Sequence, residues 1–377
     1  MTLDRSLHVD FRHRVRFTED VFSPDNPTLA SVCSDGIPRR MIAFIDAGVH
    51  QAQPDIGERV ANYLGARAKI GEPVPELKMI EVVSGGEEAK NSNEVYEQVL
   101  VAIDRYGIDR RSFVLAIGGG AVLDAVGLGA TLAHRGVRLI RMPTTTLAMD
   151  DAAMGVKNGI NKFGKKNFCG AFSVPWAVIA DERFLTTLTD QHFLSGFSEA
   201  VKIGCLKDPS LFELIEQSAP RIVARDLAAA MPIIRRSAEL HLDHITQGGD
   251  AFELNEARPL DFGHWAAHKL ESMSTSEIAH GDAVAIGIAL DCQYALQMKM
   301  LAQKDFTRII ACLQALKLPT WHPILSQTDQ LLRGLEEFRE HLGGRMNITL
   351  LRAIGESTEV HQMDSDVVAA SAKALAP

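Results

Sequence analysis

Residues 112–124 read SFVLAIGGGAVLD, and this stretch decides the fold class that the sequence predicts. An apolar run of strand length ends at three consecutive glycines, and the small residues that follow predict a helix over 121–133. Glycines in a strand-to-helix turn let a pyrophosphate approach the backbone, where the helix N-terminus offers free N–H groups. The spacing is not GxGxxG, so the turn alone fits an ordinary tight connection equally well.

Strand-like and helix-like segments alternate on both sides of this turn. Further strands are predicted over 40–46, 78–83, 137–142 and 174–180, and a helix over 93–106. From about residue 190 the pattern becomes helical, with helices predicted over 192–203, 209–222, 226–247, 262–273, 280–301 and 306–316 and a last strand over 348–351. We therefore expect an α/β protein with a parallel-sheet domain over 1–188 and a mostly α-helical domain over 189–377.

Composition restricts the class of protein. The chain of 377 residues is 46% apolar, and 48 acidic residues outnumber 39 basic ones, for a formal charge of −9. No long Lys/Arg run or basic-aromatic stripe occurs, so we expect no nucleic-acid partner. The five cysteines are scattered, the N-terminus has no apolar signal segment, and no apolar run is long enough to span a bilayer. These features predict a cytoplasmic protein with reduced thiols.

Two neighbouring segments support a nucleotide site at the glycine turn. Asp46 ends the first predicted strand, where a carboxylate can accept hydrogen bonds from ribose hydroxyls. Residues 143–146 (PTTT) follow another strand, where hydroxyl and amide groups can line a nucleotide groove. Each segment also fits an ordinary strand end.

Residues 150–167 (DDAAMGVKNGINKFGKKN) contain four lysines and two carboxylates among glycines. The segment has neither a helical nor a strand period, and therefore predicts a loop. A solvated loop is the simplest interpretation. A functional loop of this composition would supply cations for a phosphate and carboxylates for hydroxyl groups.

A second group of residues indicates a metal site. Glu199 and Lys202 are three residues apart in a largely apolar helix, which predicts a partly buried pair rather than a surface ion pair. His264 and His268 lie four residues apart and could both bind zinc. Glu199, His264 and His280 would equally form a three-ligand site with an open position, as catalytic zinc requires. Spacing alone does not choose between these two sets.

The ordered motifs IGGGAVLDAVG, HRG, PTTTL, DDAAMGVKNGIN, KKNFCGAF, SEAVKIG, DFGHWAAH and HGDAVAIGIAL resemble the dehydroquinate synthase superfamily, the sugar-phosphate cyclases. The resemblance extends over residues 40–355. It implies an N-terminal Rossmann-like NAD domain, a helical domain that binds Zn²⁺ or Co²⁺, and a homodimer. In this family NAD oxidises a ring-carbon hydroxyl, phosphate is eliminated, the hydride is returned and the ring closes by an aldol step, with the metal as Lewis acid.

The same resemblance assigns roles to individual residues. The implied metal ligands are Glu199, His264 and His280, which places His268 in the phosphate site instead. The implied NAD contacts are Asp46, Glu87, Lys90, Gly119, Gly120, Asp124, Thr144, Thr145 and Lys166. The implied phosphate ligands are Lys157, Asn167 and His268, with Arg135 reaching across the dimer. Asp151 and Lys202 are implied to bind and polarise hydroxyl groups around the reacting carbons.

The segment before His264 departs from dehydroquinate synthases, which bind a substrate carboxylate with a lysine and an arginine there. No lysine lies between Lys207 and Lys269, and Asp261 stands where those enzymes carry asparagine. A site that lacks these cations and gains a carboxylate should bind a carboxylate substrate poorly. We therefore expect a neutral ketose phosphate as substrate, with 3-deoxy-arabino-heptulosonate 7-phosphate of dehydroquinate synthase as the alternative.

The pattern RPLDFGH and the stretch FREHLGG resemble the sedoheptulose 7-phosphate cyclases, such as 2-epi-5-epi-valiolone synthase. This resemblance makes His341 a further candidate near the substrate. Those cyclases tend to have proline where this chain has His268, so the chain combines features of two branches. Sedoheptulose 7-phosphate is accordingly the expected substrate.

Two other classes share part of this pattern. Iron-type polyol dehydrogenases share the architecture, the glycine turn and the metal histidines, but a phosphate-binding set of Lys157, Lys166, Asn167 and Arg135 argues against them. A non-catalytic relative that binds NAD is disfavoured because the apparent metal and base positions are all filled.

Overall fold

The structure is a computed structural model of the chain. It describes residues 2–34, 36–37, 39–163, 165–248, 250–252, 258–274, 277–341 and 344–377, with only the backbone of His341. The chain forms two compact units, Met1–Pro143 with Val156–Asp181, and Thr144–Gly155 with Glu182–Pro377. The sequence predicted a boundary after residue 188, whereas the structure divides the chain after Asp181. The short segment Thr144–Gly155 also belongs to the second unit.

A six-stranded parallel sheet forms the centre of the first unit, with strand order β1-β8-β5-β4-β2-β3. Its strands are β1 (Val15–Thr18), β2 (Arg40–Asp46), β3 (Glu76–Val83), β4 (Phe113–Gly118), β5 (Arg138–Pro143) and β8 (Ala177–Asp181). The central strands β2 and β4 are almost entirely buried. Their continuous apolar sequences follow from this position, because both faces of the sheet are covered. The expected α/β fold class is confirmed.

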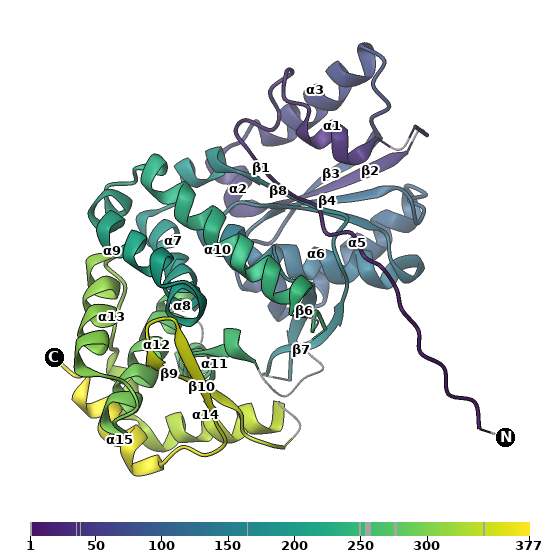
Figure 1. Ribbon diagram of the computed structural model, residues 1–377. Coiled ribbons are helices and arrows are strands. Elements are labelled where there is room, and N and C mark those ends of the chain that lie inside the picture. Colours follow the sequence, from purple (N-terminus) through teal and green to yellow (C-terminus); the bar gives the residue numbers. More distant parts are fainter. Residues whose placement is uncertain are drawn as a thin grey trace. The chain divides into compact units, whose positions relative to one another are not determined.

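The helices of the first unit cover both faces of this sheet, with α1 and α3 on one side and α5 and α6 on the other (Figure 1). They are α1 (Thr28–Cys33), α2 (Ala47–Ala52), α3 (Ile56–Lys69), α4 (Glu88–Asn91), α5 (Glu94–Arg105), α6 (Gly120–Leu132) and the 3₁₀ turn η1 (Ala133–Arg135). A side chain at Gly129 of α6 would lie 2.6 Å from Cβ of Val99 on α5. The small residues of α6 therefore allow it to pack closely against α5.

The prediction of a loop over 150–167 was wrong. The π-helical turn η2 (Ala148–Ala152) leads into an antiparallel hairpin of β6 (Lys157–Lys162) and β7 (Lys165–Phe172). Most of β7 is exposed, so it shows no alternation of apolar and polar residues. Gly159 and Gly170 face each other across the two strands, where a Cβ on Gly159 would lie 3.0 Å from the carbonyl oxygen of Cys169. The glycines that indicated a loop thus permit the strands to pair.

The second unit is mostly helical. Its elements are η3 (Glu182–Thr187), α7 (Asp190–Ser195), α8 (Phe197–Lys207), α9 (Pro209–Val223), α10 (Leu227–Gln247), η4 (Pro259–Asp261), α11 (His264–Met273), α12 (His280–Gln297), α13 (Gln303–Ala315), η5 (Pro323–Ser326), α14 (Thr328–His341), the hairpin β9 (Ile348–Ala353) and β10 (Glu356–Val360), and α15 (Ser365–Ala374). Helix α12 is buried on almost every face and packs against α8, α11, α13 and α15. It is therefore the centre of this unit.

The helix predicted over 192–203 is divided at Gly196 into α7 and α8. A side chain at Gly196 would collide with the backbone of Leu147, so this glycine lets α8 approach the segment that carries η2. The break positions Glu199 and Lys202 beside Asp150 and Asp151, whose charges act on one another.

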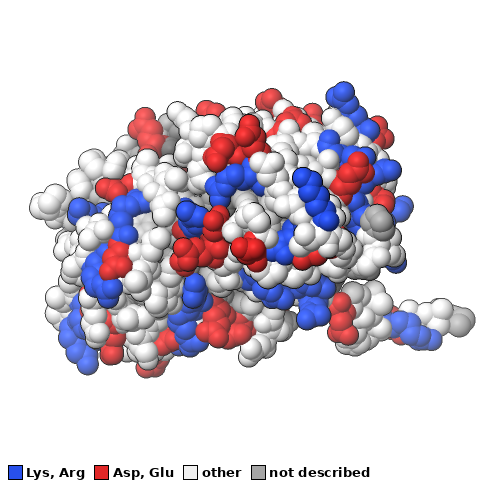
Figure 2. Space-filling model, turned by 90° about the horizontal axis from the view of Figure 1, so that it is seen from above, with Lys and Arg blue, Asp and Glu red and all other residues white. Residues whose placement is uncertain are grey.

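Charged residues on the face drawn in Figure 2 are interspersed, with Lys and Arg lying among Asp and Glu rather than in one basic field. Among the helices of the described residues, none combines the length and the apolar character needed to cross a membrane.

Candidate active site

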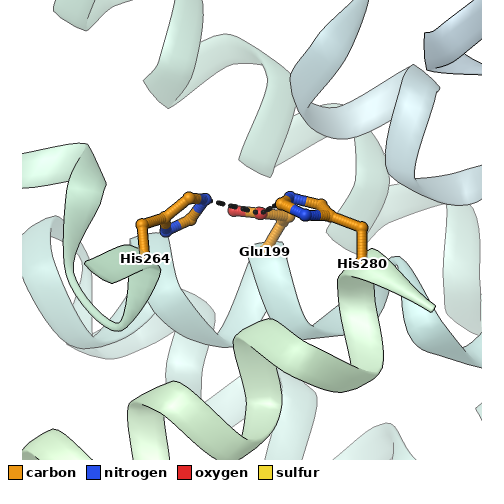
Figure 3. A group of neighbouring side chains, drawn as sticks. All are labelled: Glu199, His264 and His280. Atoms are coloured by element: carbon orange, nitrogen blue, oxygen red, sulfur yellow. Dashed lines mark ion pairs between the residues drawn. The ribbon is translucent and has the colours of Figure 1, made fainter. Parts of the chain in front are cut away.

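Three helices of the second unit bring Glu199, His264 and His280 together. Nε2 of His264 lies 3.4 Å from Oε1 of Glu199, and Nε2 of His280 lies 3.7 Å from the same oxygen. The two imidazole rings stand on either side of the carboxylate and point toward it (Figure 3). The Glu199 side chain is only 1% exposed, so this cluster is closed to bulk water on the α8 side.

The spacing of these atoms fits a metal ion better than direct hydrogen bonds. Ligand atoms about 2.0–2.2 Å from a tetrahedral ion lie about 3.4 Å from one another, close to the observed separations. Both observed distances exceed the usual range of N–H···O bonds. Within the described residues neither oxygen of Glu199 makes a well-oriented hydrogen bond. Lys202 pairs with Oε2 of Glu199, so Oε1, which faces both histidine nitrogens, is the oxygen that remains for an ion. Three protein ligands would leave one coordination position open.

Each histidine of the cluster is oriented through its other ring nitrogen. Nδ1 of His264 lies 3.2 Å from the Phe262 carbonyl oxygen, and Nδ1 of His280 lies 3.2 Å from Oε2 of Glu271. Burial alone would lower the pKa of His280, but the charges of Glu271 and Glu199 outweigh burial and raise that pKa to about 10. With an ion bound, the two acceptors would hold the Nδ1 hydrogen of each ring and leave the Nε2 lone pair for the ion. The Glu271 carboxylate is buried and contacts His280 on the side away from Glu199. A carboxylate behind a metal-binding histidine is common in zinc sites.

Asp291 of α12 holds the two residues that flank His264. Its carboxylate accepts hydrogen bonds from the Gly263 N–H at 2.9 Å and from the Trp265 indole at 2.8 Å. Burial raises the pKa of Asp291 to about 7, although both hydrogen bonds act in the opposite direction. Gly263 has φ 78°, and a Cβ there would lie 2.8 Å from the Ile288 nitrogen. The start of α11 is thus fixed against α12.

His268 lies one turn beyond His264 on α11, with ring centroids 5.5 Å apart. His268, Glu271 and His280 form a second group whose ligand atoms could hold an ion. Glu271 is already engaged with Nδ1 of His280, which favours the group around Glu199. Burial, followed by the neighbouring His264, lowers the pKa of His268 to about 3, so this ring is neutral.

Lys202 forms a buried ion pair with Glu199, in which the side chains are 3% and 1% exposed. The predicted burial of this pair is confirmed. Burial alone would lower the pKa of Lys202, but the charges of Glu199 and Asp151 outweigh it and raise that pKa. Burial alone would raise the pKa of Glu199, but Lys202 and His264 hold it well below its usual range. Both groups are therefore ionised.

Three carboxylates lie close to this pair. The charge of Asp261, in η4, acts on both Lys202 and His268. The carboxylate of Asp151 is 2.9 Å from Nδ1 of His241 on α10. Neither oxygen of Asp150 has a hydrogen-bond partner among the described residues, and burial, then the charges of Asp151 and Glu199, raise its pKa well above the usual value. These three carboxylates therefore surround the ion pair of Glu199 and Lys202.

In the first unit, the chain order of the sheet reverses between β2 and β4, which are hydrogen-bonded neighbours. In open α/β sheets, ligands bind beyond the carboxyl ends of the strands at such a point. Asp46 ends β2 and Gly118 ends β4, and a Cβ on Gly118 would lie 3.0 Å from Cβ of Asp46. The predicted ribose acceptor and the glycine turn therefore flank the same crevice.

The N-terminus of α6 also fits a phosphate. Its N-cap residue is Gly119, which provides no side-chain cap, so the first amide groups of the helix have no side-chain acceptor there. Lys90 is 6% exposed and pairs with Asp124 of α6 at 2.7 Å. The arrangement leaves the backbone of Gly119 and Gly120 accessible to an anion.

Two family models match most of the chain. The model for the 3-dehydroquinate synthase N-terminal region matches residues 80–195, and the model for its C-terminal region matches residues 196–338. This chain belongs to the 3-dehydroquinate synthase family. It is a sugar-phosphate cyclase of that superfamily, and a phosphate-eliminating cyclase is a lyase.

Relatives of this cyclase match between 66% and 99% of its length. A 2-epi-5-epi-valiolone synthase from Actinomyces sp. is 31% identical over 96% of this chain and 94% of its own. A 3-dehydroquinate synthase from Ruegeria pomeroyi is 34% identical over 66% of this chain and 69% of its own. The solved 2-epi-5-epi-valiolone synthase from Streptomyces hygroscopicus subsp. jinggangensis, with NAD⁺ and Zn²⁺ bound, superposes with a TM-score of 0.89 at 30% identity, covering 99% of both chains. The expected superfamily and fold are confirmed.

The residues expected to bind substrate and NAD divide between the two units of the cyclase. The second unit holds Asp151, Lys202, Asp261, His268 and the three proposed metal ligands, together with Thr144 and Thr145. The first unit holds Asp46, Glu87, Lys90, Gly119, Gly120, Asp124, Arg135, Lys157, Lys166 and Asn167. The side chain of His341 lies outside the described residues.

Side chains of the hairpin form a connected polar group with α4. Asn161 donates to Glu87 at 2.8 Å, and Lys166 pairs with the same Glu87 oxygen at 3.1 Å. The backbone N–H of Asn167, which has φ 52°, donates to the Asn161 side chain at 2.9 Å. Lys157 and Arg135 are exposed. Asn161 therefore supports the turn that presents Asn167, a role that the sequence did not suggest.

Three further residues of the site were missed. Glu271 lies seven residues after His264, on the same face of α11, and this spacing could have revealed it. Asp150 was obscured by the prediction of a loop. His241 meets Asp151 across 90 residues of sequence, and no local pattern indicates such a contact.

Proposed function

We propose that this cyclase converts sedoheptulose 7-phosphate into a cyclitol with loss of phosphate, using NAD and a divalent metal ion, Zn²⁺ or Co²⁺. The observation that carries the proposal is the cluster of Glu199, His264 and His280, whose spacing fits an ion with an open coordination position. The full-length similarity to 2-epi-5-epi-valiolone synthases supports the choice of sugar, and the NAD⁺ and Zn²⁺ bound by one of them support the cofactors.

When bound, the metal supplies Lewis acidity at a substrate oxygen and NAD supplies reversible hydride transfer. Glu199, His264 and His280 would hold the metal. Asp46 and the free amides at the start of α6 would hold the ribose and pyrophosphate of NAD, with Glu87, Lys90, Asp124, Thr144, Thr145 and Lys166 as further contacts.

Lys202 and Asp151 have complementary roles in this proposal. Lys202 is buried and protonated, so it can donate a hydrogen bond and stabilise negative charge that develops on a substrate oxygen. Asp151 keeps 24% of its side chain exposed and has a lowered pKa despite burial and Glu199, because His241 and Lys202 outweigh both. It can therefore accept a hydrogen bond from a hydroxyl group.

The phosphate of the substrate would be bound by Lys157, Asn167 and neutral His268. Arg135 is exposed and has a left-handed backbone, with φ 63°. We infer that it reaches the phosphate of a second subunit in a homodimer. Cations and amide donors of this kind compensate the charge of a phosphate that is bound and later released.

Asp261 carries the proposed preference for a neutral sugar. Its carboxylate is close enough to act on Lys202 and His268, and no lysine occurs between Lys207 and Lys269. A substrate carboxylate placed here would face a like charge instead of a cation, whereas a hydroxyl group would find an acceptor. His341 remains a further candidate for the same part of the substrate.

Phosphate release by the purified protein with NAD⁺ and Zn²⁺ tests the proposal. We expect release from sedoheptulose 7-phosphate, no accumulation of NADH, and a fall of about 10-fold in kcat/KM for Asp261→Asn, as loss of a charge-assisted hydrogen bond predicts. Asp243→Asn on α10 is the matched control and should leave kcat/KM unchanged. Release only from 3-deoxy-arabino-heptulosonate 7-phosphate would instead identify a dehydroquinate synthase.

A further inference from the structure

His241 lies at the edge of the candidate site, although nothing in the family motifs marks it. It belongs to α10, which packs against η2 and α8. Ile234 and Ala238 are buried on the same face of α10, seven and three residues before it. A buried apolar stripe therefore ends in an imidazole at the point where α10 meets η2. A polar ring at such a position indicates a specific partner.

That partner is Asp151, whose Oδ1 lies 2.9 Å from Nδ1 of His241. The His241 side chain is 12% exposed, so the hydrogen bond is largely shielded from water. The arginines in and just before α10 have other partners: Arg225 pairs with Asp190, Arg235 with Glu182, and Arg236 with Asp208 and Glu239. In the described part of the chain, these arginine pairs do not involve Lys202 or Asp151, whereas the pair of His241 and Asp151 lies beside Lys202.

The direction of this hydrogen bond follows from the charges around Asp151. Its carboxylate is ionised, because His241 and Lys202 outweigh burial and Glu199 in setting its pKa. An ionised carboxylate only accepts, so Nδ1 of His241 carries the hydrogen. This hydrogen bond occupies Oδ1 and does not use Oδ2, and 24% of the Asp151 side chain is exposed.

We propose that His241 is a positioning residue that determines specificity: it holds Asp151 so that the second carboxylate oxygen receives a hydroxyl group of the polyol phosphate. The inference rests on the proposed function and deepens it. The second carboxylate oxygen of Asp151 presents a hydrogen-bond acceptor to the ligand. Such an acceptor selects hydroxyl groups over a carboxylate group at this position.

Three substitutions separate this role from a purely structural tether between α10 and η2. The side-chain amide of His241→Asn can replace the Nδ1–H donor, whereas His241→Gln places its amide near Nε2 and His241→Ala has no donor. With sedoheptulose 7-phosphate we expect kcat/KM to fall about 10- to 100-fold in the Ala and Gln variants, mainly through KM, and only about 3-fold in the Asn variant. Arg236→Ala, which breaks a surface pair on the same helix, is the control and should leave kcat/KM unchanged.

Bound zinc and the thermal midpoint are measured for every variant and should match the parent protein. If His241→Ala turns over as fast as an active parent protein, the inference fails while the proposed function stands. Equal losses in all three His241 variants, accompanied by a lower thermal midpoint, would show a structural tether and also overturn it.

A parent protein that is inactive on sedoheptulose 7-phosphate would reject the proposed function, and the inference then needs a readout without turnover. ¹⁵N-histidine NMR of the zinc-loaded protein provides one, with the His241 signal assigned by its loss in His241→Asn. We expect an Nδ1-protonated ring whose signal shifts in Asp151→Asn and again on addition of a ketose phosphate. An Nε2-protonated ring, or a signal insensitive to the ligand, would overturn the inference.

Discussion

The charged side chains around Glu199 are buried, whereas those of the β6–β7 hairpin are largely accessible to water. In the second unit, Glu199 and Lys202 form a pair whose side chains are 1% and 3% exposed. In the first unit, the β6–β7 hairpin carries lysines that are exposed or half-buried, and Lys166 pairs with Glu87 at 21% and 31% exposure. The buried region holds its charges by mutual compensation, whereas water screens those of the hairpin.

Because of this difference in burial, substitutions in the two regions should have different effects on folding and on ligand binding. A buried charge that loses its partner remains desolvated, so a substitution in the second unit affects metal binding, pKa values and folding together. An exposed lysine contributes little to folding, so its substitution should act on ligand binding alone. The predictions below test this separation, beginning with the largest effect.

His264→Ala should abolish tight metal binding and reduce phosphate release by more than about 10³-fold, because one of three ligands is lost and the open coordination site is no longer formed. Metal content after dialysis and the release rate are the measurements. His268→Ala, one turn away on the same helix, is the control and should retain its metal. Loss of metal in His268→Ala would favour the second group, formed with Glu271 and His280.

Lys157→Ala should raise KM for the sugar phosphate about 10- to 100-fold while the free energy of unfolding changes by less than about 0.5 kcal/mol. The reason is that Lys157 is exposed at the start of β6, where it can contact a phosphate without supporting the core. Steady-state kinetics and urea unfolding measure the two effects. Lys165→Ala, also exposed on the hairpin, should leave both unchanged. A large loss of stability in Lys157→Ala would contradict the proposed separation.

Asp150→Asn should stabilise the protein by about 1–2 kcal/mol near pH 8, because a buried carboxylate without hydrogen bonds is removed. Its pKa is higher in the folded than in the unfolded state, so the folded state binds the proton more tightly. The contribution of Asp150 to stability is therefore fully present below pH about 4, which is the pKa in the unfolded state. It is lost as the pH rises from there through the pKa of the folded state.

Urea unfolding of the parent protein and Asp150→Asn at pH 5 and pH 8 measures this effect. The advantage of the variant should be larger at pH 8. Asp104→Asn on the exposed side of α5 should show no such dependence on pH. An advantage that is equal at both pH values would show that Asp150 is paired rather than isolated.

Local sequence was sufficient for several elements. The strand predicted over 40–46 coincides with β2. The apolar run before the three glycines, which starts at residue 112, begins one residue before β4, because each strand is an apolar run bounded by polar or glycine residues. Helices α9 and α10 begin within one residue of their predicted starts, after Asp208 and Asp226, whose side chains accept hydrogen bonds from the first turn.

Other elements had no local signal. The edge strand β1 has four residues, and its pairing with β8 joins residues 15–18 to 178–181. The hairpin of β6 and β7 was predicted as a loop because its stability comes from strand pairing and not from an apolar face. The single helix predicted over 192–203 is divided because Gly196 meets Leu147, a contact that no window of sequence contains.

The amino-acid sequence by itself determined the α/β class, the glycine turn after β4, the cyclase family and the residue types of a metal site. These follow from local periodicity and from ordered motifs, both of which are properties of short segments. The family resemblance implied Glu199, His264 and His280 as one ligand set, and the tertiary structure brings them to one centre. Only the tertiary structure decided that Glu271 contacts His280 and that His241 contacts Asp151. Each of these contacts joins separate elements, and their atoms approach only when α8, α10, α11 and α12 pack into one core.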